Sequence, residues 1–181
     1  MAILCSTGRE IIIQSFFDFH GAATYLKTLH IICKIPILYH RKFLRGCFVV
    51  WRLVELIPPT TIFMDENILS IASLYLLMDE ENVILVDPGA DIVYPLLRMK
   101  LSKLGVERNR VEYIVLTHMH FDHFFNVVYF PRAKIIVCRE CVDNWRESLR
   151  RTLVEETAER FYELIFADRD ITYIDSGKEF V

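Results

Sequence analysis

Three of the six histidines of this chain lie within a single segment, residues 117–123, which reads Thr-His-Met-His-Phe-Asp-His. Imidazole and carboxylate groups are good ligands for Zn²⁺, Fe²⁺ or Mn²⁺. On an extended backbone alternate residues project to the same side, so His118 and His120 should face one point. Asp122 and His123 then turn with the chain toward a neighbouring point, where a second ion could bind. We therefore expect these four residues to be metal ligands.

A histidine-rich start of a helix is the alternative interpretation of this segment. In that arrangement Asp122 is the helix N-cap, and the imidazoles form hydrogen bonds with the backbone. The alternative explains one histidine well and three poorly, so metal binding is the stronger hypothesis.

The segments around the histidines predict the elements that position them. Residues 112–117 form an apolar strand with a buried centre, and loops that follow buried strands commonly carry functional groups. The other expected elements are strands at 47–54, 71–78, 82–87, 134–137, 171–174 and from 179, a helix between Pro95 and Gly105, and one long helix at 142–167. An acidic turn at 79–81 joins two of the strands into a hairpin. This order predicts an α/β chain whose sheet is covered by helices.

Composition narrows the class of protein. The chain has 181 residues, 53% of them hydrophobic, and a net charge of −3. A chain of this kind forms one domain with a substantial core and is not disordered. The charge gives no electrostatic reason to expect nucleic acid. The apolar stretches are too short, or too often interrupted by charges, to reach the roughly 20 residues of a membrane span. We expect a cytoplasmic protein with no membrane partner.

The cysteines include one C-x-x-C pair, Cys138 and Cys141, among five in the chain. No second pair accompanies it, so a structural zinc site would lack half of its ligands. The favoured interpretation is two buried or half-buried thiols where a strand passes into a helix. A redox role or a disulfide is the alternative.

The histidine segment also resembles a known family. Together with Val-Asp-Pro-Gly at 86–89 and the helix-then-strand passage at 124–137, it resembles the metallo-β-lactamase superfamily. The local sequence is most similar to acyl-homoserine lactonases and other small single-domain members. The resemblance covers residues 46–181. Residues 1–45 are expected to be an unmatched extension, helical in part.

This resemblance implies an αββα sandwich with one or two divalent metal ions at an edge of its sheets. Zinc is the expected metal, and iron and manganese are alternatives. His118 and His120 would bind the first ion, and Asp122 and His123 the second. A metal-activated water would attack the carbonyl of a small lactone, ester or thioester, while Asp122 orients the water or accepts its proton. Asp87 would hydrogen-bond to the ligands from behind, or would simply end its strand in a turn.

The chain departs from the family pattern in one respect. The family completes its site with a downstream His, a bridging Asp and a final His, but no histidine follows His123. We therefore expect only the first half of the domain, a weak metal site and an uncovered sheet that associates with itself or with a partner half. Whether the chain is an enzyme is left open, and a non-catalytic binding fragment is the alternative. Asp168, Asp170 and Asp175 are expected to be surface turn residues.

Overall fold

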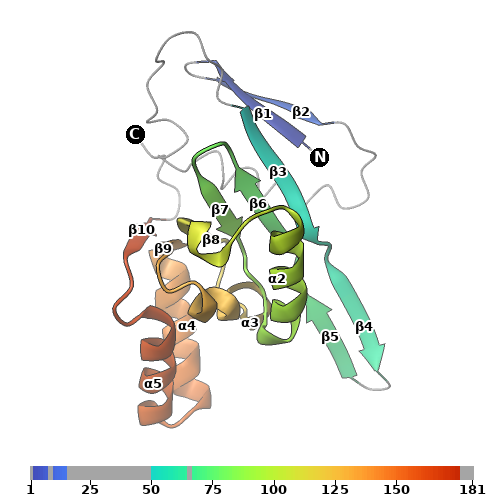
Figure 1. Ribbon diagram of the computed structural model, residues 1–181. Coiled ribbons are helices and arrows are strands. Elements are labelled where there is room, and N and C mark those ends of the chain that lie inside the picture. The colour runs from blue at the N-terminus through green and yellow to red at the C-terminus, as the bar shows by residue number, and fades with distance from the viewer. Residues whose placement is uncertain (1, 8–9, 16–49, 65–66, 176–181) are drawn as a thin grey trace.

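The computed structural model describes residues 2–7, 10–15, 50–64 and 67–175 (Figure 1). They form an eight-stranded sheet in the order β10-β9-β8-β7-β6-β3-β1-β2, with β4 and β5 as a separate projecting hairpin. The strands are β1 (Ala2–Thr7), β2 (Glu10–Ser15), β3 (Val50–Ile57), β4 (Thr60–Met64), β5 (Asn67–Ile71), β6 (Leu74–Met78), β7 (Val83–Val86), β8 (Tyr113–Leu116), β9 (Lys134–Cys138) and β10 (Ile171–Ile174).

Helices alternate with the later strands. They are α2 (Tyr94–Lys103), α3 (Phe121–Phe124), α4 (Arg139–Thr152) and α5 (Glu155–Phe166), with 3₁₀ turns η2 (Asp91–Val93), η3 (Arg108–Arg110) and η4 (Phe125–Tyr129). The predicted α/β class is therefore confirmed. Within the described ranges, no helix is long and apolar enough to span a membrane.

Four neighbouring strands, β7 to β10, are parallel to one another. Their carboxyl ends therefore meet at one edge of the sheet. Asp87 follows β7, Thr117 follows β8 and Cys138 ends β9. In open α/β sheets this edge is where ligands usually bind. The fold thus brings the predicted site residues and the cysteine pair to the same edge.

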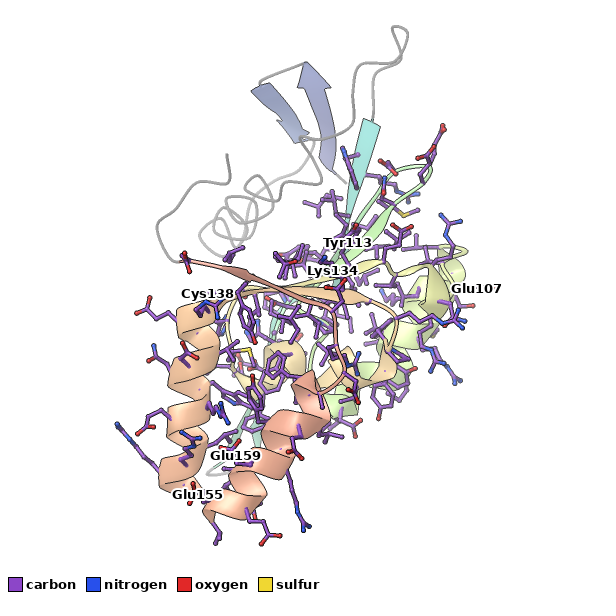
Figure 2. All side chains as sticks on the ribbon, turned by 90° about the vertical axis from the view of Figure 1, so that its left-hand side faces the viewer. Glu107, Tyr113, Lys134, Cys138, Glu155 and Glu159 are labelled. Atoms are coloured by element: carbon purple, nitrogen blue, oxygen red, sulfur yellow. The ribbon has the colours of Figure 1, made fainter. Side chains whose placement is uncertain are left out.

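The central strands are apolar on both faces, as expected for strands buried between two layers. Along β6 and β7, Leu76 and Leu85 belong to one core, and Leu77 and Ile84 to the other. The first core also contains side chains of α2, α4 and α5. Figure 2 shows α4 and α5 lying side by side against one face of the sheet. These helices cover that face of the sheet.

Two locally encoded features agree with the prediction. In the β6–β7 hairpin, Oδ1 of Asp79 accepts hydrogen bonds from the backbone N–H groups of Glu81 and Asn82, at 2.8 and 2.6 Å. At the end of α2, Gly105 has φ of +70°, and the N–H of Val106 returns to the carbonyl of Leu101 at 3.0 Å. This is the Schellman arrangement that favours glycine.

The strand predicted at 71–78 was placed too early. Its first residue, Ile71, ends β5, and β6 begins only at Leu74. The break consists of Ala72 and Ser73, which are both buried. A single serine in an otherwise apolar run is a weak signal for a break between two strands that belong to different sheets.

The single long helix predicted at 142–167 is wrong. The chain forms α4 and α5, separated by Leu153 and Val154, whose backbones are extended. A straight helix of that length would measure about 39 Å and would carry its second half beyond the sheet. By folding back, α5 places Phe166 against Trp145 of α4, with ring centroids 5.9 Å apart. Burial of the second apolar stripe therefore decides the break.

The described part of residues 1–45 forms strands rather than helix. β1 pairs with β2 and also with β3, so it continues the main sheet. Residues 16–49 and the strand predicted from 179 lie outside the described residues, and the domain boundary at 46 stays a prediction. Asp168, Asp170 and Asp175 are exposed, as expected for surface turn residues.

Candidate metal-binding site

The histidine loop, residues 117–120, connects β8 to α3. His120 is the N-cap of α3 with an extended backbone, and Asp122 and His123 lie inside that helix. The alternative in which Asp122 is the helix N-cap is therefore wrong. The short helix turns Asp122 and His123 back toward the loop, so the side chains of all four predicted ligands gather at the end of β8.

The nitrogen and oxygen atoms of the predicted ligands form two pairs. Nε2 of His118 lies 3.0 Å from Nδ1 of His120. Two nitrogens on one tetrahedral zinc ion, with bonds of about 2.0 Å, are separated by about 3.3 Å. Nε2 of His123 lies 3.9 Å from Oδ2 of Asp122. The rings of His118 and His123 have centroids 3.8 Å apart, so the two pairs are neighbours.

The Asp87 carboxylate forms hydrogen bonds with Thr117 of the histidine loop and with His123 of α3. Its carboxylate is buried and accepts hydrogen bonds from the Thr117 hydroxyl at 2.6 Å and the Thr117 N–H at 2.9 Å. The same carboxylate lies 2.9 Å from Nδ1 of His123. Asp87 therefore both ends its strand in a turn and forms a hydrogen bond with His123, while its role behind metal ligands stays a prediction.

The hydrogen bonds around Asp87 assign the tautomers of two imidazoles. Nδ1 of His123 donates to the Asp87 carboxylate, which leaves the lone pair on Nε2. The Thr117 hydroxyl donates to Asp87 and accepts from Nδ1 of His118, 3.0 Å away, which leaves the second lone pair on Nε2 of His118. Outer hydrogen bonds of this type orient metal-binding histidines.

The electrostatic environment of His118 also favours the neutral form of its imidazole. Burial, and then repulsion from the neighbouring His123, lowers the pKa of His118 below its ordinary value. A neutral imidazole offers a lone pair, and metal ions bind that form.

Gly89 joins the loop after β7 to α3. Its N–H donates to the carbonyl of His123 at 2.9 Å, and its carbonyl accepts from the N–H of Asn126 at 3.0 Å. Its φ is +91°, and a Cβ there would lie 2.7 Å from Cγ2 of Val93. Only glycine fits this position without strain. Asp87, two residues earlier, also has a positive φ of +49°.

Asn126 holds the same two segments together from inside. It is fully buried, and its Nδ2 donates to the carbonyls of Pro88 at 2.9 Å and Ala90 at 2.7 Å. Sequence reasoning assigned no positioning role to Asn126, Gly89 or Thr117. The available signals were an amide shortly after the Asp-His pair and a hydroxyl directly before the first histidine.

The donor set suits a divalent metal ion, but the geometry is open. Among the side chains that the structure describes, no group of three or more His, Cys, Asp or Glu residues is arranged to hold one ion. Two ligands on a tetrahedral ion leave positions for water, substrate or further protein ligands. The residues present therefore fit metal ions as two pairs of ligands, and they do not form a complete set of ligands around a single ion.

The sequence model of the metallo-beta-lactamase superfamily matches residues 69–180, and the chain belongs to this superfamily. The predicted family is confirmed. A search of curated proteins finds no match. Members of the superfamily include hydrolases and usually bind divalent metals.

One of the similar solved structures, from Thermotoga maritima, supports the fold. A Thermotoga maritima protein assigned as a metallo-beta-lactamase is 22% identical, with a TM-score of 0.57 over 72% of this chain and 62% of that chain. The hydrolase AbOPH is 18% identical, with a TM-score of 0.49 over 75% and 60%. A Cronobacter sakazakii metallo-beta-lactamase is 27% identical, with a TM-score of 0.37 over 44% and 31%. This chain therefore spans less than two thirds of the length of these relatives.

Proposed function

We propose that this protein is a metal-dependent hydrolase of small lactones, esters or thioesters. The observation that carries the proposal is the network in which Asp87 and Thr117 fix the outer nitrogens of two histidines and leave lone pairs on their Nε2 atoms, that of His118 facing Nδ1 of His120 at 3.0 Å. Zinc is the proposed metal, with iron and manganese as alternatives. A cytoplasmic location and the absence of nucleic-acid partners stay predictions.

The four proposed ligands would bind metal ions as two pairs. Nε2 of His118 and Nδ1 of His120 would hold one ion, and Nε2 of His123 with Oδ2 of Asp122 a second. When bound, a divalent metal supplies a nucleophilic water near neutral pH and polarises a carbonyl. The Asp122 side chain is 27% exposed, so it can reach an attacking water, orient it and accept its proton.

Asp87 acts through His123. Its carboxylate holds the Nδ1 proton, so that Nε2 stays available as a ligand, and it fixes the ring plane. Because it also binds Thr117, one buried carboxylate sets the orientation of both ligand pairs. Asp87 is therefore a positioning residue rather than a catalytic one.

A binding module without turnover is the second candidate. It is favoured by the absence of a closed three-ligand group among the described side chains. Such a module would use a sheet face for self-association or for a partner half that completes the site. It predicts metal binding that is weak, and no hydrolysis by the isolated chain.

The test uses the full chain, stripped with a chelator and reloaded with Zn²⁺, Mn²⁺ or Fe²⁺. Bound metal is measured by mass spectrometry, and hydrolysis is followed on an acyl-homoserine lactone, an aryl ester and a thioester. We expect His118→Ala and Asp122→Ala each to lose metal and activity, by at least about a hundredfold in activity. Asp143→Ala, a change at an exposed carboxylate of α4, is the matched control and should change neither.

Two results decide between the candidates. Activity and metal content that are unchanged in both variants would contradict the hydrolase proposal. Metal that depends on His118, without turnover of any of the three substrates, would instead support the binding module.

A further inference from the structure

The C-x-x-C pair occupies the strand end next to the candidate metal site and plays no part in it. Cys138 is the last residue of β9 and the N-cap of α4, and Cys141 lies in the first turn of that helix. Figure 2 shows Cys138 where the sheet meets α4. Both cysteines are free thiols and are half-buried.

The local geometry brings the two sulfur atoms together. A helix N-cap and the residue three positions later lie over the same end of the helix. The Cα atoms of residues three apart in a helical turn fall within the separation of about 4.4–6.8 Å that a disulfide spans. Within the described chain, no His, Asp or Glu joins them in a group that could hold a metal ion. The pair therefore has the proximity a disulfide requires, without the ligands of a metal site.

The two thiols differ in environment. Burial, and then the hydrogen bond with Cys138, raises the pKa of Cys141 to about 12. Cys141 is therefore protonated near neutral pH and is a poor first nucleophile. Cys138 stands at the N-terminus of the 14-residue α4, where its side chain makes no capping hydrogen bond. The positive end of the helix dipole is at this position.

We propose that Cys138 and Cys141 form a redox-active dithiol that closes into a disulfide across the first turn of α4. The oxidant is a small disulfide such as glutathione disulfide. The Cys138 thiolate attacks one sulfur of that disulfide, forms a mixed disulfide and expels one glutathione thiolate. The Cys141 thiol then gives its proton to solvent, attacks the Cys138 sulfur and expels the second glutathione thiolate. One small disulfide becomes two thiols, and two protein thiols become one disulfide.

The test uses the full chain in buffers of defined glutathione to glutathione disulfide ratio. Free thiols are blocked, the chain is denatured, and a tryptic digest is analysed without reduction. Trypsin cleaves after Lys134, Arg139 and Arg146, so the two cysteines fall in different peptides, 135–139 and 140–146. We expect these two peptides to be joined, with a mass two hydrogens below their sum, and dithiothreitol to separate them.

Single variants test the order of the steps. Cys141→Ser should stop at a stable glutathione adduct on Cys138. Cys138→Ser should react at least about tenfold more slowly at Cys141, because so little of that thiol is ionised. Circular dichroism of both variants confirms that each remains folded.

Three results would overturn the proposal. The first is a wild-type chain that keeps glutathione on Cys138 without closing the second bond. The second is linkage of either cysteine to Cys5, Cys33 or Cys47. The third is an adduct that forms equally fast at Cys141 in the Cys138→Ser variant. None of these results depends on the proposed hydrolase activity.

Discussion

The histidine loop and the outer surface of the α4–α5 hairpin carry different kinds of polar interaction. The histidine loop and the helical turns α3 and η4 that follow it depend on buried and half-buried hydrogen bonds between residues far apart in the sequence, such as Asp87 with Thr117 and His123. The surface of the hairpin carries ion pairs between residues at most 13 positions apart, and those of Glu159 with Arg146 and Arg150 join the two helices.

The two kinds of interaction differ in how much each contributes to the free energy of unfolding. Removing one partner of a buried hydrogen bond leaves the other partner unsatisfied, at a cost of about 1–3 kcal/mol. An exposed ion pair contributes about 0–1 kcal/mol, because water and salt screen both charges. The loop should therefore be sensitive to single substitutions, and the ion-paired surface of the hairpin should tolerate them.

The largest effect is expected from Gly89→Ala. The new Cβ would lie 2.7 Å from Val93 at a positive φ, so overlap and backbone strain add. We expect a loss of about 3–4 kcal/mol in the free energy of unfolding, measured by urea denaturation. Gly105→Ala is the matched control. It also has a positive φ but meets nothing within 4 Å, so about 1 kcal/mol should be lost. Equal losses would show that packing of the loop does not matter.

Asp87→Ala should have the second largest effect. It removes the acceptor of three hydrogen bonds and leaves the Thr117 N–H without a partner. We expect a loss of about 2–3 kcal/mol in the same denaturation experiment. Asp87→Asn should retain part of this stability, because Asn tolerates a positive φ and keeps one acceptor oxygen. If Asp87→Ala were as stable as wild type, the hydrogen bonds of Asp87 would not contribute to the stability of the loop.

Asn126→Ala should follow. The buried Pro88 carbonyl loses its side-chain donor, the Ala90 carbonyl keeps only the N–H of Val93, and a small cavity forms. We expect about 1–2 kcal/mol by thermal or urea unfolding. Asn144→Ala, at an exposed position of α4, is the control and should be within about 0.5 kcal/mol of wild type.

The smallest effect is expected from Glu159→Gln in the hairpin. Hydrogen bonds from Arg146, and then from Arg150, lower the pKa of Glu159 below its ordinary 4.5. A lowered folded-state pKa adds stability above the ordinary value, and this stability disappears as the pH falls through the lowered value. The melting temperature of wild type should therefore exceed that of Glu159→Gln slightly at pH 7 and match it in strong acid.

High salt provides a second test of the ion pairs of Glu159. The small difference between wild type and Glu159→Gln should shrink in 1 M NaCl, where charges are screened over about 3 Å. Glu163→Gln is the control, since no ion pair involves its carboxylate among the described residues. If Glu159→Gln lowered the free energy of unfolding as much as Gly89→Ala, the proposed difference between the loop and the hairpin surface would be wrong.

Local signals predicted much of the fold. The hairpin at Asp79, the helix between Pro95 and Gly105 and the strand at 171–174 depend on turn residues and apolar alternation within a few positions, and the structure confirms them. The ion pairs Glu147–Arg151 and Glu156–Arg160 follow from helical spacing, and both are present. The break between α4 and α5 has no such signal, because the packing of two helices on one sheet decides it.

The types and spacing of the proposed ligands are encoded locally, because His118, His120, Asp122 and His123 lie within six residues and local geometry limits where they can point. Tertiary structure decided what fixes them. Asp87 is 36 residues from His123, and the parallel pairing of β7 with β8 brings it there. Buried hydrogen bonds across such a distance depend on the packed sheet, which no local pattern encodes.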